Sequence, residues 1–164
     1  MERREKLMLA MTRYECGVPQ RVQHFIKVHA FARLIGLSEG LDARTQEILE
    51  TAALVHDIGI RPALEKYGDA AGPLQEKEGE APARQMLTEL GYDAALVERV
   101  CYLVAHHHTY AGAAGADYRI LLEADYLVNA FEGGQSEDAI RAARGSFFET
   151  KTGKQLLDDM FALR

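Results

Sequence analysis

The 164-residue sequence contains few cysteines, no long apolar run and no excess of positive charge. Its two cysteines, Cys16 and Cys101, lack the close spacing of metal-binding thiols, which argues against a disulfide scaffold and a zinc–thiolate site. No segment approaches the roughly 18 uninterrupted apolar residues that a membrane-spanning helix needs. The formal net charge of -6 disfavours broad binding to nucleic acid or anionic membranes, although a local basic pocket can still bind one phosphate.

Signal-peptide features are also lacking at the start of the sequence. Residues 1–6 mix charges of both signs and precede only a short apolar run, without a small-residue cleavage site. We therefore expect a cytoplasmic protein. The hydrophobic content of 48% is sufficient for a packed core, and the length fits a single domain that spans residues 1–164.

Strand signals are absent too, because the sequence shows no sustained apolar–polar alternation and no Asn-Gly hairpin turn. Apolar residues instead recur at spacings of three and four, which predicts an all-α fold. The expected helices cover residues 2–14, 19–35, 42–56, 80–90, 94–107, 118–131, 136–144 and 153 or 154 to 163, with Asp42 and Ser136 as N-caps. Residues 59–79 contain two prolines and several glycines, so we expect them to be largely loop.

The same periodicity indicates which polar side chains point inward. His24 lies on an otherwise apolar face of its helix, and His56 ends a broad buried face immediately before Asp57. His107 and Asp125 each continue an apolar stripe of their own helices. Four segments that are distant in the sequence thus each offer an inward imidazole or carboxylate.

This combination of side chains is typical of a metal site. A buried carboxylate is costly unless it is paired or binds a metal ion. Imidazole nitrogens with carboxylate oxygens suit octahedral Mn, Fe, Co or Ni and also accept Zn. Such a site leaves positions for water, whose pKa a bound metal lowers.

At these residues the chain resembles the HD domain family, which is named for a His-Asp pair. The match comprises His24-x-x-x-Val28-x-x-x-Ala32, the segment Ala53-Leu54-Val55-His56-Asp57-Ile58-Gly59, then His107, and finally Glu123-Ala124-Asp125-Tyr126-Leu127. The motifs occur in family order within about residues 20–130, which leaves residues 135–164 as a helical extension. The resemblance implies a compact helical bundle in which His24, His56, Asp57 and Asp125 coordinate a divalent metal ion.

The number and identity of the metal ions stay open. Two-metal members of the family carry a further His before the fourth helix and another in a His-His pair. Gln75 stands where the first of these would be, so we favour one metal ion and leave a second open. Glu76 or Glu78 could supply an oxygen ligand instead, which would favour a harder metal. Mn, Fe, Mg, Co, Ni and Zn are not distinguished.

The consecutive histidines 106–108 cannot all face one point, because neighbouring residues on a helix lie about 100° apart. We expect His107 to face the metal as a ligand or catalytic group. His106 and His108 would then flank the cleft as proton donors or phosphate contacts. Arg61 and Lys66 could contact a phosphate, although ordinary surface positions are an equally good interpretation.

Several other conspicuous residues are interpreted as structural. His29 lies off the face of His24, and Cys101 is a small residue in an apolar stretch. Phe147, Phe148 and Phe161 are expected to pack helices rather than to line a ligand site.

The function that the resemblance implies is a metal-dependent phosphohydrolase with a small-molecule phosphoester as substrate, for example a nucleotide. The metal would activate water, Asp57 would orient that water, and His107 or Arg61 would stabilise charge or protonate the leaving oxygen. Residues 59–79 would form the lid. Two alternatives stay open, a diiron oxygenase of the same fold and a non-catalytic metal-containing binding module. Substrate and oligomeric state are not determined.

Overall fold

The computed structural model describes residues 1–163, and over this range it contains nine α-helices and no strand. The predicted all-α fold is therefore confirmed. In chain order the helices are α1 (Arg3–Tyr14), α2 (Pro19–Ser38), α3 (Ala43–Val55), α4 (Ile60–Tyr67), α5 (Gly72–Glu89), α6 (Ala94–Val104), α7 (Ala116–Glu132), α8 (Glu137–Ser146) and α9 (Lys151–Phe161). Among these helices, none is both long and apolar enough to cross a membrane.

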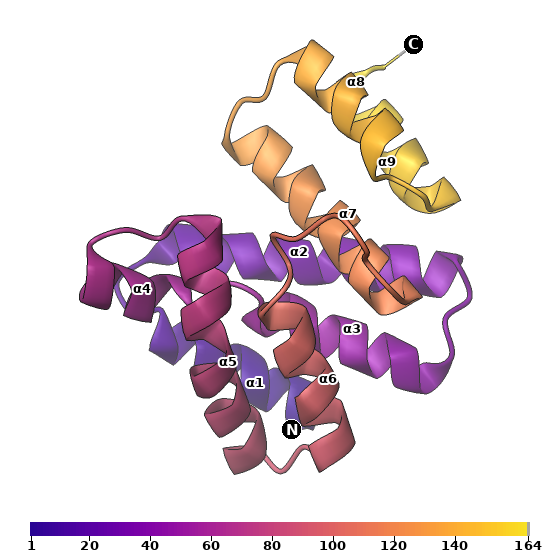
Figure 1. The fold of residues 1–164 in the computed structure, drawn as a ribbon. Helices are drawn as coiled ribbons and strands as arrows, with labels where there is room; N and C mark the ends of the chain where they lie inside the picture. Colours follow the sequence, from indigo (N-terminus) through magenta and orange to yellow (C-terminus); the bar gives the residue numbers. More distant parts are fainter. Residues whose placement is uncertain (164) are drawn as a thin grey trace.

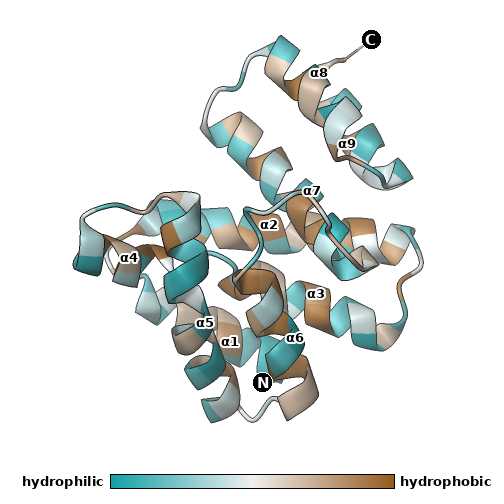
Figure 2. Cartoon of the chain, viewed as in Figure 1, coloured by the Kyte–Doolittle hydropathy of each residue, from teal (hydrophilic) through white to brown (hydrophobic). Residues whose placement is uncertain are grey.

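Helices α2, α3 and α7 form the centre of the molecule. Helix α2 packs against α3 and α7, and α3 also packs against α6 and α7. Helices α5 and α6 lie together at one end, whereas α8 and α9 form a pair at the other end (Figure 1). The hydrophobic segments of α3, α6 and α7 lie toward the centre, with hydrophilic segments of α5 and α9 on the outside (Figure 2). One continuous apolar core receives side chains from α1–α3 and from α5–α9.

Side-chain caps explain where several helices begin. The Asp42 carboxylate accepts hydrogen bonds from the backbone N–H groups of Arg44 and Thr45, and the Ser136 hydroxyl accepts one from Ala139. Each such cap stabilises a helix start by about 1 kcal/mol. Both N-caps predicted from the sequence are confirmed.

The prediction of a loop over residues 59–79 is wrong, because most of this segment forms α4 and α5. Pro62 and Pro73 lie in the first turns of these helices, where a missing backbone N–H costs no helical hydrogen bond. Gly68 ends α4 in the left-handed conformation, with a φ of 67°. The two prolines and most of the glycines therefore mark helix starts and ends, whereas Gly79 lies inside α5, and the expected lid is a pair of packed helices.

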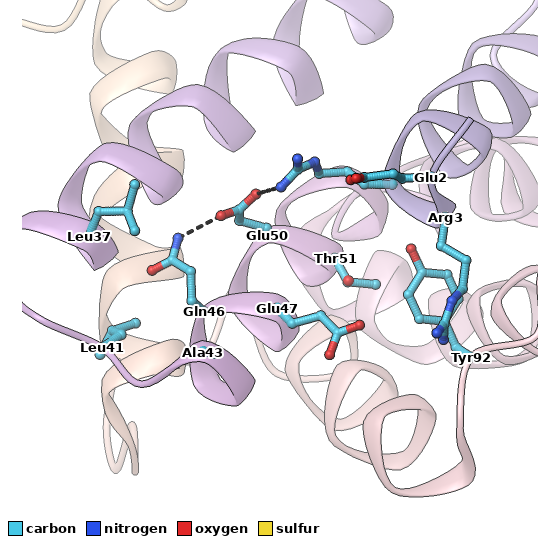
Figure 3. Close-up of a pocket in the computed structure, with 11 residues that line it drawn as sticks. Glu2, Arg3, Leu37, Leu41, Ala43, Gln46, Glu47, Glu50, Thr51 and Tyr92 are labelled. Atoms are coloured by element: carbon cyan, nitrogen blue, oxygen red, sulfur yellow. Dashed lines mark hydrogen bonds and ion pairs between the residues drawn. The ribbon is translucent and has the colours of Figure 1, made fainter.

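A buried carboxylate connects the first three helices. Glu50 of α3 lies 2.6 Å from Arg4 Nη1 of α1, 2.8 Å from Gln46 Nε2 and 3.2 Å from His29 Nε2 of α2. Burial alone would raise the pKa of Glu50, but the hydrogen bonds from Gln46 and Arg4 outweigh burial and lower it. His29 is thus structural, as its position off the His24 face indicates. Glu50 is one of the residues that line a cavity of about 590 Å³ (Figure 3).

The start of α4 makes a close approach to α5 at Gly59. A Cβ atom on Gly59 would overlap the backbone oxygen of Gln75 and lie 2.9 Å from the backbone nitrogen of Gly79. Glycine at this position therefore allows the chain that follows Asp57 to lie directly against α5.

We predict that Gly59→Ala lowers the free energy of unfolding by about 1–3 kcal/mol, because the added methyl group has no space beside the α5 backbone. Gly145→Ala is the matched control, since a Cβ atom on this α8 residue would have no neighbour within 4 Å. This control should leave stability unchanged or raise it by about 1 kcal/mol through helix propensity. Urea unfolding followed by circular dichroism measures both, and equal effects of the two substitutions would contradict the close approach.

Candidate metal centre

Three elements bring four predicted residues to one point. His24 comes from α2, His56 and Asp57 follow α3 directly, and Asp125 comes from α7. His24 Nε2 lies 3.2 Å from His56 Nε2, 3.1 Å from Asp125 Oδ1 and 3.3 Å from Asp57 Oδ2. His56 Nε2 lies 3.3 Å from Asp125 Oδ1 and 3.4 Å from Asp57 Oδ2. The structure thus places together all four residues that the sequence proposes as ligands.

The outer ring nitrogens of the two histidines are engaged by hydrogen-bond acceptors. His56 Nδ1 lies 2.8 Å from the backbone oxygen of Ala53, and His24 Nδ1 lies 2.9 Å from Glu132 Oε2. A backbone carbonyl accepts only, as does a carboxylate paired with Lys27, so each Nδ1 carries the proton and donates it. In the neutral imidazoles, both Nε2 atoms then direct a lone pair toward the centre of the cluster.

The inward-facing atoms of the cluster are consequently all electron-pair donors. Two nitrogen lone pairs and the oxygens of Asp57 and Asp125 face one another at 3.1–3.4 Å, an arrangement that is repulsive unless a cation neutralises it. A divalent ion with nitrogen and oxygen ligands satisfies all of them at once. The residues present therefore fit the metal ion that the sequence predicts.

Without such an ion, protons provide the positive charge. Burial alone would lower the pKa of His24, but the hydrogen bond to Asp125 and the charge of Asp57 outweigh burial and raise it. The same carboxylates raise the pKa of the fully buried His56 well above its ordinary value. Burial would raise the pKa of Asp57, yet the imidazoles of His56 and His107 keep that pKa well below its usual range.

His107 repeats this arrangement on the other side of Asp57. Its Nδ1 donates a hydrogen bond to the backbone oxygen of Val104 over 2.9 Å, and its Nε2 lies 3.3 Å from Asp57 Oδ1. This Nε2 is buried and has no hydrogen-bond partner within residues 1–163. Asp57, His107 and His108 offer ligand atoms within 4.8 Å of one another. The two oxygens of Asp57 therefore face two neighbouring clusters.

Gln75 lies at this second cluster, where its amide contacts His108. Gln75 Nε2 donates to the backbone oxygen of Ala70, so Oε1 is the acceptor that lies 2.9 Å from His108 Nε2. Glu76 accepts hydrogen bonds from the backbone N–H of His108 and the hydroxyl of Thr109, over 2.8 and 3.1 Å. Glu76 thus fixes the turn that carries the histidines.

Three other predicted site residues lie away from the cluster. Helix α6 ends at Val104, so the histidines occupy a turn, and His106 stacks on Tyr102 with ring centroids 4.1 Å apart. Arg61 lies 3.7 Å from Glu15 and above the Tyr14 ring. Glu78 pairs with Lys66 and Tyr67.

Comparison with known proteins agrees with the motifs and the geometry. The chain matches the family described as HD domain over residues 21–144, which is more than half of its length. The chain belongs to the HD domain family. Its fold is similar to the crystal structure of a predicted HD superfamily hydrolase from an uncultured Thermotogales bacterium, with a TM-score of 0.71 and 22% sequence identity. The similarity covers 96% of this chain and 84% of that chain, whereas no curated protein matches.

A cleft of about 260 Å³ leads from the surface of this HD domain to the cluster, where His24, Asp57 and His108 line it. The other lining residues are Gln20, Arg21, Ile60, Gln75, Asn129 and Glu132. Five of these were not singled out from the sequence, although helical spacing could have found four of them. Gln20 and Arg21 precede His24 by four and three residues, and Asn129 and Glu132 follow Asp125 by four and seven.

In metal-depleted protein, we predict that the free energy of unfolding falls as pH rises above about 6.5. Stability from a histidine with a raised folded-state pKa is fully present below the unfolded value of 6.5 and is lost as pH rises through the folded value. Each proton that only the folded state retains contributes a slope of about 1.4 kcal/mol per pH unit. Urea unfolding at several pH values, with a chelator present, measures this dependence of the free energy of unfolding on pH.

Metal affinity should change in the opposite direction over the same pH range, because metal binding displaces these protons. Isothermal titration with Mn²⁺ measures this trend. A free energy of unfolding that stays constant as pH rises above about 6.5 would contradict protonation of His24 and His56 in the metal-depleted protein.

A second prediction concerns the carboxylate behind His24. Glu132→Ala removes the acceptor of the Nδ1 proton and should weaken metal binding about 10- to 100-fold, whereas Glu132→Gln keeps an acceptor and should have a smaller effect. Glu137→Ala, which alters an exposed pair on α8, is the matched control. Titration with Mn²⁺ compares the variants, and an unchanged affinity in Glu132→Ala would exclude this orienting role.

Proposed function

We propose that this HD domain is a metal-dependent phosphohydrolase that acts on a small phosphoester. The observation that carries the proposal is the set of inward-facing electron-pair donors on His24, His56, Asp57 and Asp125, onto which a surface cleft opens. A cation centre at the base of a small cleft suits a substrate whose reacting group is anionic. The family membership supports hydrolysis of this kind, and the substrate is part of the proposal.

Hydrolysis requires that a water oxygen form a new P–O bond while the ester P–O bond breaks and a proton reaches the leaving oxygen. A bound divalent ion supplies Lewis-acid polarisation of a phosphate oxygen and a lowered pKa for water. Asp57 lines the cleft and accepts a hydrogen bond from the attacking water, which orients it. His107 lies behind Asp57 and positions its second oxygen.

The remaining groups in the proposed reaction come from the cleft walls. His108 lines the cleft, whereas His106 stacks on Tyr102 outside it, so His108 is the better placed of the two to contact the leaving oxygen. Both Arg61, the cation expected from the sequence, and Arg21 lie near Glu15, at 3.7 and 2.9 Å, but only Arg21 is among the residues that line the cleft. We therefore assign the phosphate contact to Arg21 in place of Arg61.

We propose one resident metal ion, held by His24, His56, Asp57 and Asp125. Two nitrogens and two carboxylates suit Mn, Fe, Co, Ni or Zn, and they accept Mg less readily. A second ion would need Asp57, His107 and His108 with the amide of Gln75, which is a weaker ligand than the imidazole of two-metal relatives. A diiron oxygenase depends on that second ion.

The decisive variant is Asp57→Ala, which removes a ligand common to both clusters. We expect it to lose bound metal and to reduce phosphoester hydrolysis to background, while the helical circular-dichroism signal is retained. Asp159→Ala, which replaces an exposed aspartate of α9, is the matched control and should keep both properties. Metal analysis of the purified proteins and a phosphoester panel provide the readouts, and wild-type hydrolysis by Asp57→Ala would refute the proposal.

The same measurements separate the alternatives. Two irons per chain with substrate-dependent oxygen uptake would favour a diiron oxygenase. Saturable ligand binding without hydrolysis across the panel would favour a binding module.

A further inference from the structure

We propose that the cleft selects a phosphate monoester of a small sugar or polyol rather than a nucleotide. This inference rests on the proposed phosphohydrolase function and names its substrate class. It follows from the chemistry of the residues that line the cleft, from their charges and from the cleft volume.

The described lining of the cleft offers a nucleobase no large aromatic ring on which to stack. None of the described residues that line it is Phe, Tyr or Trp, and Ile60 is the one aliphatic residue among them. Three aromatic residues outside the lining contact one another instead, because Phe147 packs on Tyr110 at 4.5 Å and on Tyr126 of α7 at 5.2 Å between ring centroids. Recognition of a planar base commonly uses such rings, so their absence from the lining disfavours a nucleotide.

The lining offers hydrogen-bonding groups that match hydroxyls. The amides of Gln20 and Asn129 belong to exposed residues on α2 and α7, and each amide can both donate and accept. Glu132 lies 2.9 Å from His24 Nδ1 and 2.6 Å from Lys27 Nζ, and a carboxylate has further acceptor positions. A hydroxyl group also donates and accepts, so a polyol can satisfy these groups together.

Charge and volume favour a single phosphate. Among the described lining residues, Arg21 is the one Lys or Arg, whereas Asp57 and Glu132 are acidic. Arg21 Nη1 lies 2.9 Å from Glu15, a buried carboxylate that orients the guanidinium. A second phosphate would find no further cation among these lining residues, because Lys27 lies outside the lining and is paired with Glu132. The volume of about 260 Å³ is below the roughly 300–1,000 Å³ of sites for drug-sized ligands.

The first test compares kcat/KM across substrates with the metal-loaded wild-type protein. Ribose 5-phosphate, glucose 6-phosphate and glycerol 3-phosphate represent the proposed class, and AMP and ATP represent nucleotides. We expect the best sugar or polyol phosphate to exceed AMP by about tenfold or more, a ratio that the loss of one well-placed hydrogen bond can produce. Equal or faster hydrolysis of AMP or ATP would overturn the substrate class but leave the phosphohydrolase function standing. No hydrolysis of any phosphoester would overturn both.

The second test asks whether the side-chain amides of Gln20 and Asn129 bind the hydroxyl groups of the sugar. Gln20→Ala and Asn129→Ala should each raise KM for the best sugar phosphate by about threefold to tenfold. Neither should change kcat/KM for p-nitrophenyl phosphate, which has no hydroxyls, or the bound metal content. Gln85→Ala is the matched control, because Gln85 is exposed on α5 and pairs with Glu89. Equal losses for both substrates would overturn the assignment of these amides.

Arg21 provides an internal comparison, since it would contact the phosphate that all substrates share. Arg21→Ala should reduce kcat/KM for the sugar phosphate and for p-nitrophenyl phosphate by a similar factor, with the metal content retained. A loss confined to the sugar phosphate would overturn the phosphate assignment of Arg21.

Discussion

The main constraint on the structure is the mutual repulsion among the electron-pair donors around Asp57, which positive charge must offset. Nitrogen lone pairs of His24 and His56 face carboxylate oxygens at 3.1–3.4 Å in a buried environment, which only a cation or added protons make stable. Each imidazole is fixed from behind by an acceptor, so it cannot rotate to relieve the repulsion. The fold thus creates one buried site that requires a bound cation or added protons.

Packing of α2, α3 and α7 holds the donors together, and the next helices hold the second oxygen of Asp57 in place. Gly59 follows the His-Asp pair closely, and its lack of a side chain allows α5 to lie against the chain there. That approach brings Gln75 and Glu76 to the turn of His107 and His108. The environment of Asp57 is therefore set by residues up to about seventy positions away.

The C-terminal helices α8 and α9 are linked to α7, the helix that carries Asp125. Glu123, two residues before Asp125, is fully buried and accepts backbone hydrogen bonds from Glu149 and Thr150 over 2.6 and 2.9 Å. Phe148 enters the apolar core, and Phe147 and Phe161 pack against it, as the sequence indicates. The aromatic residues of this region thus serve packing, and the cleft on the other side of α7 is left with polar walls.

The sequence by itself determined the helical class, the HD domain family and the inward direction of His24, His56, Asp57 and Asp125, because helical periodicity and motif order are local properties of a chain. It did not determine that residues 59–79 form two helices, since proline and glycine mark helix ends as well as loops. The sequence favoured His107 over its two neighbours, but only the tertiary structure decided that Asp57 is its partner and that Arg21 lines the cleft in place of Arg61. The reason is physical: periodicity reports which face of a helix is buried, but the partner that buries it comes from elsewhere in the chain.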